Sequence, residues 1–70
     1  MRILGIDPGL NVTGYGVIEE KGFKLIEAGV IRTRSNTPIQ DRINKIFDEI
    51  SGIIKEHEPS VLVLDRKSVV

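Results

Sequence analysis

The sequence predicts a small α/β fold in which three strands are followed by a helix and a fourth strand. Three short apolar runs lie at residues 3–6, 13–19 and 23–31, and only a few turn residues separate them. An amphipathic stretch comes next, and a fourth apolar run lies at residues 61–64. Seventy residues are enough for one small domain with a thin stability margin. The predicted order is therefore β-β-β-α-β.

The connections between the apolar runs predict how the strands pair. Turn residues occupy the stretch after the first run, DPGLN, and the stretch EKG at residues 20–22. Strands joined this closely form antiparallel hairpins. A helix between two strands is typical of a parallel crossover, so the fourth strand is expected to lie beside the first.

The helix is predicted from the periodicity of its apolar residues. Isoleucines recur at three- and four-residue steps from Ile39 to Ile53, and Phe47 and Ile54 widen this stripe. Most charged residues fall outside it. This pattern indicates an amphipathic helix whose stripe lies in the core. Residues 37–40 form a T-x-x-Q capping-box pattern with a proline in the first turn. Pro59 is expected to end the helix.

Composition limits the classes of function. Ten basic and ten acidic residues give a formal charge of zero, so composition does not support nucleic-acid binding and such a function has to come from a site. The absence of cysteine excludes disulfides and cysteine metal sites. No apolar segment is long enough for a signal peptide or a membrane helix. These features fit a cytoplasmic protein with no membrane partner.

The stretch GIDPGLNVTGYGVI, residues 5–18, contains the candidate site. Asp7 ends an apolar strand, a position where α/β sheets place functional groups, and its carboxylate offers hard oxygen ligands to Mg²⁺ or Mn²⁺. Gly14 and Gly16 remove side chains from the neighbouring strand, so a ligand or a second backbone has room to approach. The alternative interpretation is an ordinary Asp-Pro-Gly turn with glycines that mark bulges.

This stretch resembles a family signature. ILGIDPGLNVTGYGVI is similar to the N-terminal motif of the RuvC family of Holliday junction resolvases, and DRINKIFDEISGIIKEHEPSVLVL resembles that family's first helix and fourth strand. The resemblance covers residues 2–64. It implies a ribonuclease-H-like mixed sheet with helices on both faces. It also implies a homodimeric, Mg²⁺-dependent endonuclease that cuts four-way DNA junctions in recombination and repair, alongside branch-migration proteins.

The resemblance also implies a role for Asp7, which matches one of the family's four acidic metal ligands. Two bound ions then activate water and stabilise the leaving oxygen of the phosphodiester. Family members carry a Glu at the end of the fourth strand, where this chain has Asp65, one methylene shorter. Asp65 is therefore the candidate for a second ligand.

The resemblance ends at residue 65. The stretch DRKSVV is the in-frame translation of the sequencing-adapter DNA GATCGGAAGAGCGTCGTG, so residues 65–70 are expected to be a non-native tail. Residues 1–64 are then the N-terminal part of a nuclease domain, without the family's remaining acids and DNA-binding segments. The 70-residue chain alone is expected to be inactive. The alternatives are a naturally short gene, or a phosphate-binding pair formed by Arg66 and Lys67.

Two other functions stay open. An actin-like or sugar-kinase-type ATP-binding fragment also begins with an apolar strand and Asp-x-Gly, but such chains usually place Thr or Ser where this chain has Leu10. A non-enzymatic α/β module is the other alternative.

Among the remaining polar residues, Tyr15 is expected to pack against the sheet, and Arg32 and Arg34 to be solvated. His57 is expected to lie by the last carbonyls of the helix.

Overall fold

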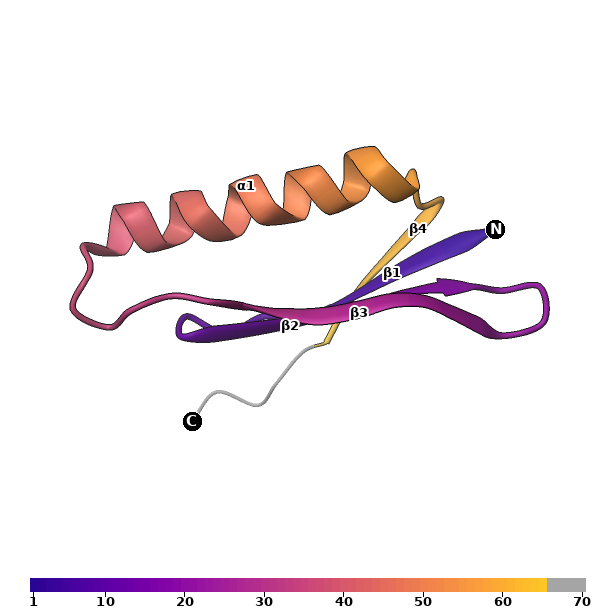
Figure 1. Ribbon diagram of the computed structural model, residues 1–70, viewed down its shortest axis with the longest axis horizontal. Helices are drawn as coiled ribbons and strands as arrows, with labels where there is room; N and C mark the ends of the chain where they lie inside the picture. Colours follow the sequence, from indigo (N-terminus) through magenta and orange to yellow (C-terminus); the bar gives the residue numbers. More distant parts are fainter. Residues whose placement is uncertain (66–70) are drawn as a thin grey trace.

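The computed structural model describes residues 1–65, which form one helix beside a sheet (Figure 1). The predicted order of elements is confirmed. The elements are β1 (Arg2–Asp7), β2 (Val12–Glu19), β3 (Lys24–Arg32), α1 (Ile39–His57) and β4 (Val61–Leu64). Most of the expected tail, including Arg66 and Lys67, lies outside the described residues.

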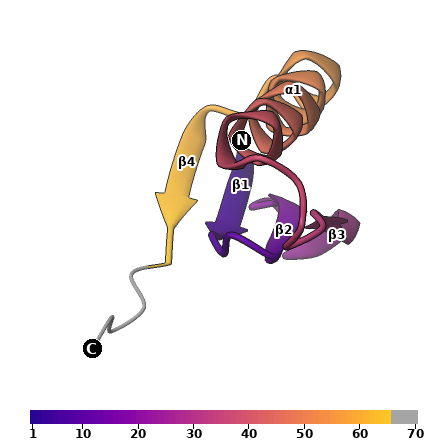
Figure 2. The same cartoon turned by 90° about the vertical axis from the view of Figure 1, so that its left-hand side faces the viewer.

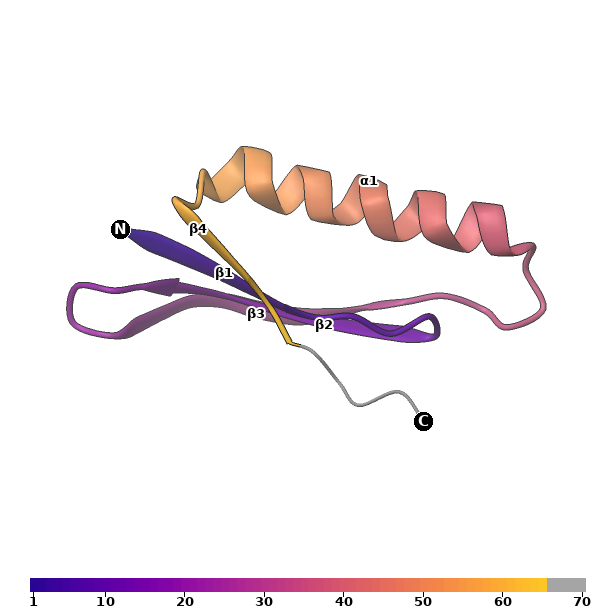
Figure 3. The ribbon, with the colours of Figure 1, turned by 180° about the vertical axis from the view of Figure 1, so that it is seen from behind.

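The four strands form one sheet in the order β3-β2-β1-β4, which can be followed in Figure 2. Figure 3 shows the helix and the sheet from behind. β1 pairs antiparallel with β2, and β2 pairs antiparallel with β3, as the short turns predicted. β4 pairs parallel with β1, from Ile3 opposite Val61 to Ile6 opposite Leu64. β2 and β4 therefore lie on opposite sides of β1, and α1 connects β3 to β4.

One face of the sheet is covered by α1, as the view along the helix in Figure 2 shows. On this face Leu4, Ile6 and Val17 meet Ile53 of the helix and form the core. Leu4 and Val17 have no exposed surface. Because side chains alternate along a strand, the next position after Ile6 points to the opposite face. Asp7 therefore lies on the face of the sheet away from α1.

The apolar stripe of α1 is only partly buried, so the expectation that the whole stripe lies in the core is wrong for residues 1–65. Ile53 is in the core, and Ile50 packs against it. Four large apolar side chains of the helix are 41 to 68% exposed: Ile39, Ile43, Phe47 and Ile54. Ile43, Phe47 and Ile54 lie roughly 80° around the helix axis from the residues that face the sheet.

The row of α1 that faces the sheet includes polar residues. The buried residues of the helix are Arg42, Ile53 and His57. Arg42 and His57 are each 8% exposed, and they lie near opposite ends of the helix. The inward face is therefore apolar at Ile50 and Ile53 and polar near each end, at Arg42 and His57.

The predicted capping box is wrong. The helix begins at Ile39 with Pro38 in the N-cap position, and no side chain caps it. Thr37 therefore does not pair with Gln40 as expected. Its backbone N–H instead donates to the Arg34 carbonyl at 3.0 Å and closes a turn before the helix. The predicted stop is confirmed, because the helix ends at residue 57, just before Pro59.

Leu4→Ala tests the core. Leu4 is fully buried, so its truncation leaves a cavity under α1, and we expect a loss of about 2–5 kcal/mol in the free energy of unfolding. Urea denaturation followed by circular dichroism measures this loss. Phe23→Ala is the control, because Phe23 is 88% exposed, and its expected change is below about 0.5 kcal/mol. Equal losses in both variants would contradict a core centred on Leu4.

Candidate active site

The structure brings Asp7 and Asp65 to the same edge of the sheet. Asp7 is the last residue of β1, and Asp65 directly follows β4. The Asp65 N–H donates to the Ile6 carbonyl at 2.8 Å, so the parallel ladder continues past Leu64. By this register Asp65 is the neighbour of Asp7, on strands about 4.8 Å apart and on the same face. The carboxyl ends of parallel strands are where open α/β sheets bind their ligands.

The face of the sheet around Asp7 carries little side-chain bulk. Gly14 lies opposite Asp7, and Gly16 lies opposite another glycine of β1. A Cβ built on Gly14 would lie 3.8 Å from the Asp7 Cβ, which places both positions on one face. The alternative interpretation that these glycines mark bulges is wrong, since the register shift of β2 against β3 falls between Val17 and Ile18. The glycines therefore remove side-chain bulk beside the carboxylate, whose Oδ1 atom is buried.

The turn after Asp7 is fixed by Thr13, which is 1% exposed. The Thr13 hydroxyl donates to the Gly9 carbonyl at 2.7 Å and accepts the Gly9 N–H at 3.3 Å. A Cβ at Gly9 would lie only 2.2 Å from the Val12 carbonyl oxygen. The turn therefore requires glycine at this position for lack of space, and its shape sets where β1 ends.

Arg42 holds the same turn from the side of the helix. Its guanidinium donates to the Leu10 carbonyl at 3.2 Å and to the Asn11 side-chain oxygen, and its Nε donates to the Thr33 hydroxyl at 3.2 Å. Thr33 also donates from its hydroxyl to the Leu10 carbonyl and from its N–H to the Asn11 carbonyl. Sequence reasoning missed Arg42, because an arginine outside the apolar stripe has the pattern of a solvated residue.

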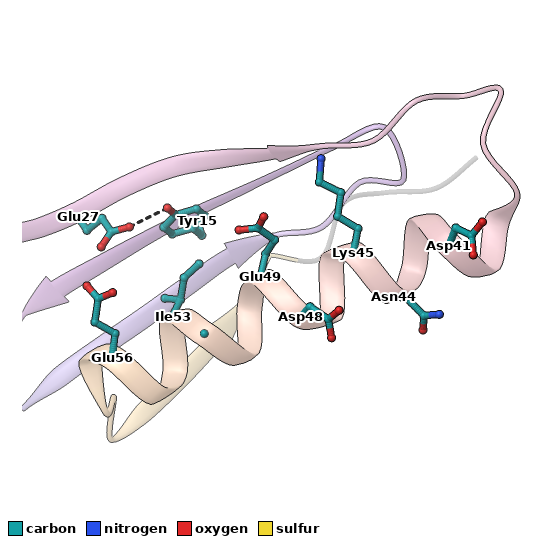
Figure 4. A pocket seen from close by; sticks show the side chains of 10 residues that line it. Tyr15, Glu27, Asp41, Asn44, Lys45, Asp48, Glu49, Ile53 and Glu56 are labelled. Atoms are coloured by element: carbon teal, nitrogen blue, oxygen red, sulfur yellow. Dashed lines mark hydrogen bonds between the residues drawn. The ribbon is translucent and has the colours of Figure 1, made fainter.

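A second polar cluster lies at the C-terminal end of α1. His57 Nε2 is 2.7 Å from a Glu27 oxygen and 3.2 Å from a Glu56 oxygen. The Tyr15 hydroxyl donates to the other Glu27 oxygen at 2.8 Å, a bond that Figure 4 marks with a dashed line. Tyr15 packs against the core as expected. His57 is the last residue of α1, as expected, and it is also buried and bonds Glu27 of β3.

These hydrogen bonds change the pKa of Glu27 and the pKa of Tyr15. The bond from His57, followed by the bond from Tyr15, lowers the pKa of Glu27. The bond to the Glu27 carboxylate raises the pKa of Tyr15. Glu27, Glu56 and His57 each offer a ligand atom within 4.8 Å of the others.

The side of α1 that faces β2 and β3 forms an acidic groove of about 720 Å³ (Figure 4). Lys45 is the single basic residue among those that line it. Its acidic lining residues are Glu27, Asp41, Asp48, Glu49 and Glu56. Neither Asp7 nor Asp65 borders this groove, so the acidic groove and the predicted site are separate places on the described chain.

A mixed sheet with an antiparallel meander and a helical crossover to a parallel fourth strand defines the ribonuclease-H-like class. RuvC of T. thermophilus in complex with a Holliday junction substrate superposes with a TM-score of 0.92, at 23% identity, over all of this chain and 45% of that one. A second T. thermophilus RuvC structure gives 0.87 at 26% identity, over 99% of this chain and 45% of that one. The Aquifex aeolicus Ppx/GppA phosphatase gives 0.66 at 20% identity, over 91% of this chain and 25% of that one, and shows the fold alone.

Sequence comparison identifies the family. The family model for the crossover junction endodeoxyribonuclease RuvC matches residues 3–67. The chain is 44% identical over 68 residues to RuvC of Syntrophotalea carbinolica and 46% identical to RuvC of Burkholderia cenocepacia, covering 94% of this chain in each case. The chain belongs to the RuvC family of crossover junction endodeoxyribonucleases. The ATP-binding alternative is not favoured.

The chain spans about two fifths of the length of the curated relatives it matches, 42% of the Syntrophotalea protein and 37% of the Burkholderia protein. Within residues 1–65, α1 does not have the apolar length that a membrane-spanning helix needs.

Gly9→Ala tests the turn that follows Asp7. The added Cβ would overlap the Val12 carbonyl, so we expect a loss of about 1–3 kcal/mol in the free energy of unfolding. Gly52→Ala is the matched control. A Cβ at Gly52 meets nothing within 4 Å, and alanine favours the helix, so we expect a gain of about 0.5–1 kcal/mol. Urea denaturation separates the two, and a neutral Gly9→Ala variant would contradict the tight turn.

Glu27→Gln tests the polar cluster through pH. Because hydrogen bonds lower the pKa of Glu27 from its usual 4.5, its stabilising effect is complete above pH 4.5 and is lost as pH falls through the folded-state pKa. The variant lacks this contribution, so its urea midpoint is expected to fall less than that of the parent when pH drops below 4.5. Glu20→Gln, at an exposed turn position, is expected to keep the parent's pH dependence. Identical pH profiles for the parent and Glu27→Gln would contradict the cluster.

Proposed function

We propose that this chain forms part of the active site of a divalent-metal-dependent endonuclease that cuts four-way DNA junctions. The observation that carries the proposal is the placement of Asp7 and Asp65 at adjacent strand ends, in a chain of the RuvC family. The relatives bear the name of a crossover junction endodeoxyribonuclease, and one structural neighbour is described in complex with a Holliday junction substrate. These comparisons support DNA as the substrate.

The residues at this edge fit a divalent cation. Asp7 and Asp65 are hard oxygen donors of the kind that Mg²⁺ and Mn²⁺ prefer, and Gly14 leaves space beside Asp7. When bound, such an ion lowers the pKa of a water molecule and stabilises the leaving oxygen of a phosphodiester. In this proposal both carboxylates are metal ligands. Mg²⁺ is the proposed ion, with Mn²⁺ as the alternative.

Activity is proposed to need more than this chain. Two metal ions and a phosphate require more carboxylates than the pair Asp7 and Asp65 provides. We therefore infer that the 70-residue chain is inactive by itself. A second copy of the nuclease and branch-migration proteins are the proposed partners, and the cytoplasm is the proposed location. The family resemblance supports the partners, and the sequence composition supports the location.

The proposed boundary of the native segment is residue 64. In this proposal residues 1–64 are the N-terminal part of a nuclease domain, and residues 65–70 are non-native. Asp65 provides a carboxylate beside Asp7 whatever the origin of these residues. Sequencing the source DNA through the codon of Leu64 tests the boundary, and a genomic DRKSVV followed by a stop codon would contradict it.

A chimera tests the activity. Residues 1–65 replace the matching N-terminal part of the Syntrophotalea carbinolica relative, which is 44% identical to this chain. We expect Mg²⁺-dependent cleavage of a four-way junction, because the rest of the relative supplies the missing groups. Asp7→Asn is expected to lower the cleavage rate at least about 100-fold, as loss of a metal-site group does. Asp48→Asn, on the helix, is the control with an expected rate near that of the parent chimera.

The identity of residue 65 gives a second comparison in the same chimera. Asp65→Glu restores the longer carboxylate of the family and is expected to cut at least as fast as the parent chimera. Asp65→Asn is expected to lose activity as Asp7→Asn does. A folded chimera in which Asp7→Asn cuts as fast as the parent would overturn the assignment and favour a non-enzymatic module.

A further inference from the structure

A basic groove lies between the end of β3 and the start of α1, and it does not include the carboxylates of the proposed metal site. Its volume is about 520 Å³. Arg32, Arg34, Arg42 and Lys45 line it, and Asp41 is its one acidic residue. The threonines at positions 33 and 37 add hydroxyl groups to its wall. We call this feature the β3–α1 groove.

The four basic residues of the β3–α1 groove outnumber its one acidic residue, Asp41. Within residues 1–65, none of its four cations forms an ion pair. Lys45 donates to the Arg32 carbonyl at 2.6 Å, and Arg42 donates to neutral oxygens only. The Arg34 side chain makes no hydrogen bond within the same residues. A net charge of +3 therefore lines one concave site of a chain whose formal charge is zero.

The groove lies at the same end of the sheet as Asp7. Asp7 is opposite Gly14 in β2, and Arg32 is opposite Val12, two residues nearer the turn. Two strand spacings of about 4.8 Å separate β1 from β3, roughly 10 Å in all. Asp7 points to the face of the sheet away from α1, whereas the groove is lined by α1 residues, so the two sites share an end of the sheet and not a face.

Arg42 lies between the β3–α1 groove and the turn that follows Asp7. It borders the groove and also donates to the Leu10 carbonyl in the turn after Asp7. Because Arg42 is 8% exposed and held by fixed acceptors, it keeps a positive charge at the groove without the entropy cost of ordering a free side chain. Arg34 is exposed and free to turn toward a ligand, and Lys45 is exposed and is held only by its bond to the Arg32 carbonyl.

We propose that the β3–α1 groove binds backbone phosphates of a nucleic-acid strand, as a contact distinct from the metal site. The identification of the polyanion as DNA rests on the proposed function. Arg34 and Lys45 contact phosphate oxygens, and the Thr37 hydroxyl donates to them, as such groups do in nucleic-acid complexes. Phosphates are common to every sequence, so the contact positions the strand and does not select bases.

Binding of the 70-residue chain to labelled DNA tests this proposal. Fluorescence anisotropy is measured with a four-way junction in EDTA, from about 50 to 200 mM salt, so that no metal-dependent step contributes. Arg34→Gln is the main variant, because its side chain has no structural bond to lose. We expect roughly fivefold to tenfold weaker binding near 0.1 M salt, and a salt slope smaller by about 0.9, for one lost phosphate contact.

Three further variants make the test specific. Lys45→Gln is expected to behave like Arg34→Gln, and Arg34→Lys is expected to retain most of the binding because it keeps the charge. Lys55→Gln removes an exposed cation at the other end of α1 and is expected to leave affinity and salt slope unchanged. Circular dichroism confirms that each variant keeps the parent's fold.

The outcomes separate this proposal from the proposed function. If Arg34→Gln and Lys55→Gln have the same effect, or the chain binds no DNA, the groove proposal is wrong, whatever the chimera cuts. If the groove variants weaken binding while the chimera fails to cut, the groove stands and the nuclease assignment fails. The last measurement compares inorganic phosphate with junction DNA as the ligand. Amide shifts around Arg34 that respond to phosphate but not to junction DNA would overturn nucleic acid as the ligand.

Discussion

The pairing of β1 with a strand on each side is the constraint on which the rest of this structure depends. The ladder to β2 fixes Gly14 opposite Asp7, and the ladder to β4 fixes Asp65 beside it. A shift of one residue in either register would turn a carboxylate to the face that α1 covers, where apolar side chains would leave it unsolvated. The site therefore follows from strand pairing, and the core enforces that pairing by burying Leu4 and Ile6 on the opposite face.

Polar contacts determine how α1 lies on this sheet as much as the apolar core does. The fully buried apolar contact centres on Leu4 and Val17, which fix the middle of the layer. Arg42 ties one end of the helix to the turn after β1, and His57 ties the other end to Glu27 of β3. A buried donor without its partner costs more than the bond itself contributes, so these contacts favour one orientation of the helix over its alternatives.

The sequence predicted the features that depend on periodicity and chain connection. The order of elements, the place of β4 beside β1 and the position of Asp7 at a strand end all follow from apolar runs and short turns. It missed the roles of Arg42 and His57, because burial of a charged residue depends on acceptors from distant parts of the chain. The capping box failed for a local reason, since Pro38 takes the N-cap position and Thr37 bonds backward.

The formal charge of zero conceals an uneven distribution that a composition count does not detect. Near the start of α1 the β3–α1 groove carries a net positive charge, while farther along the helix the lining is acidic around Glu27 and Glu56. The two grooves meet at Asp41 and Lys45. At physiological ionic strength the Debye length is about 8 Å, so a phosphate responds to the nearest charges more than to the sum over the chain. The acidic lining repels a nucleic-acid backbone from one part of the helix, the basic lining attracts it to the other, and the attracting end is the one beside Asp7.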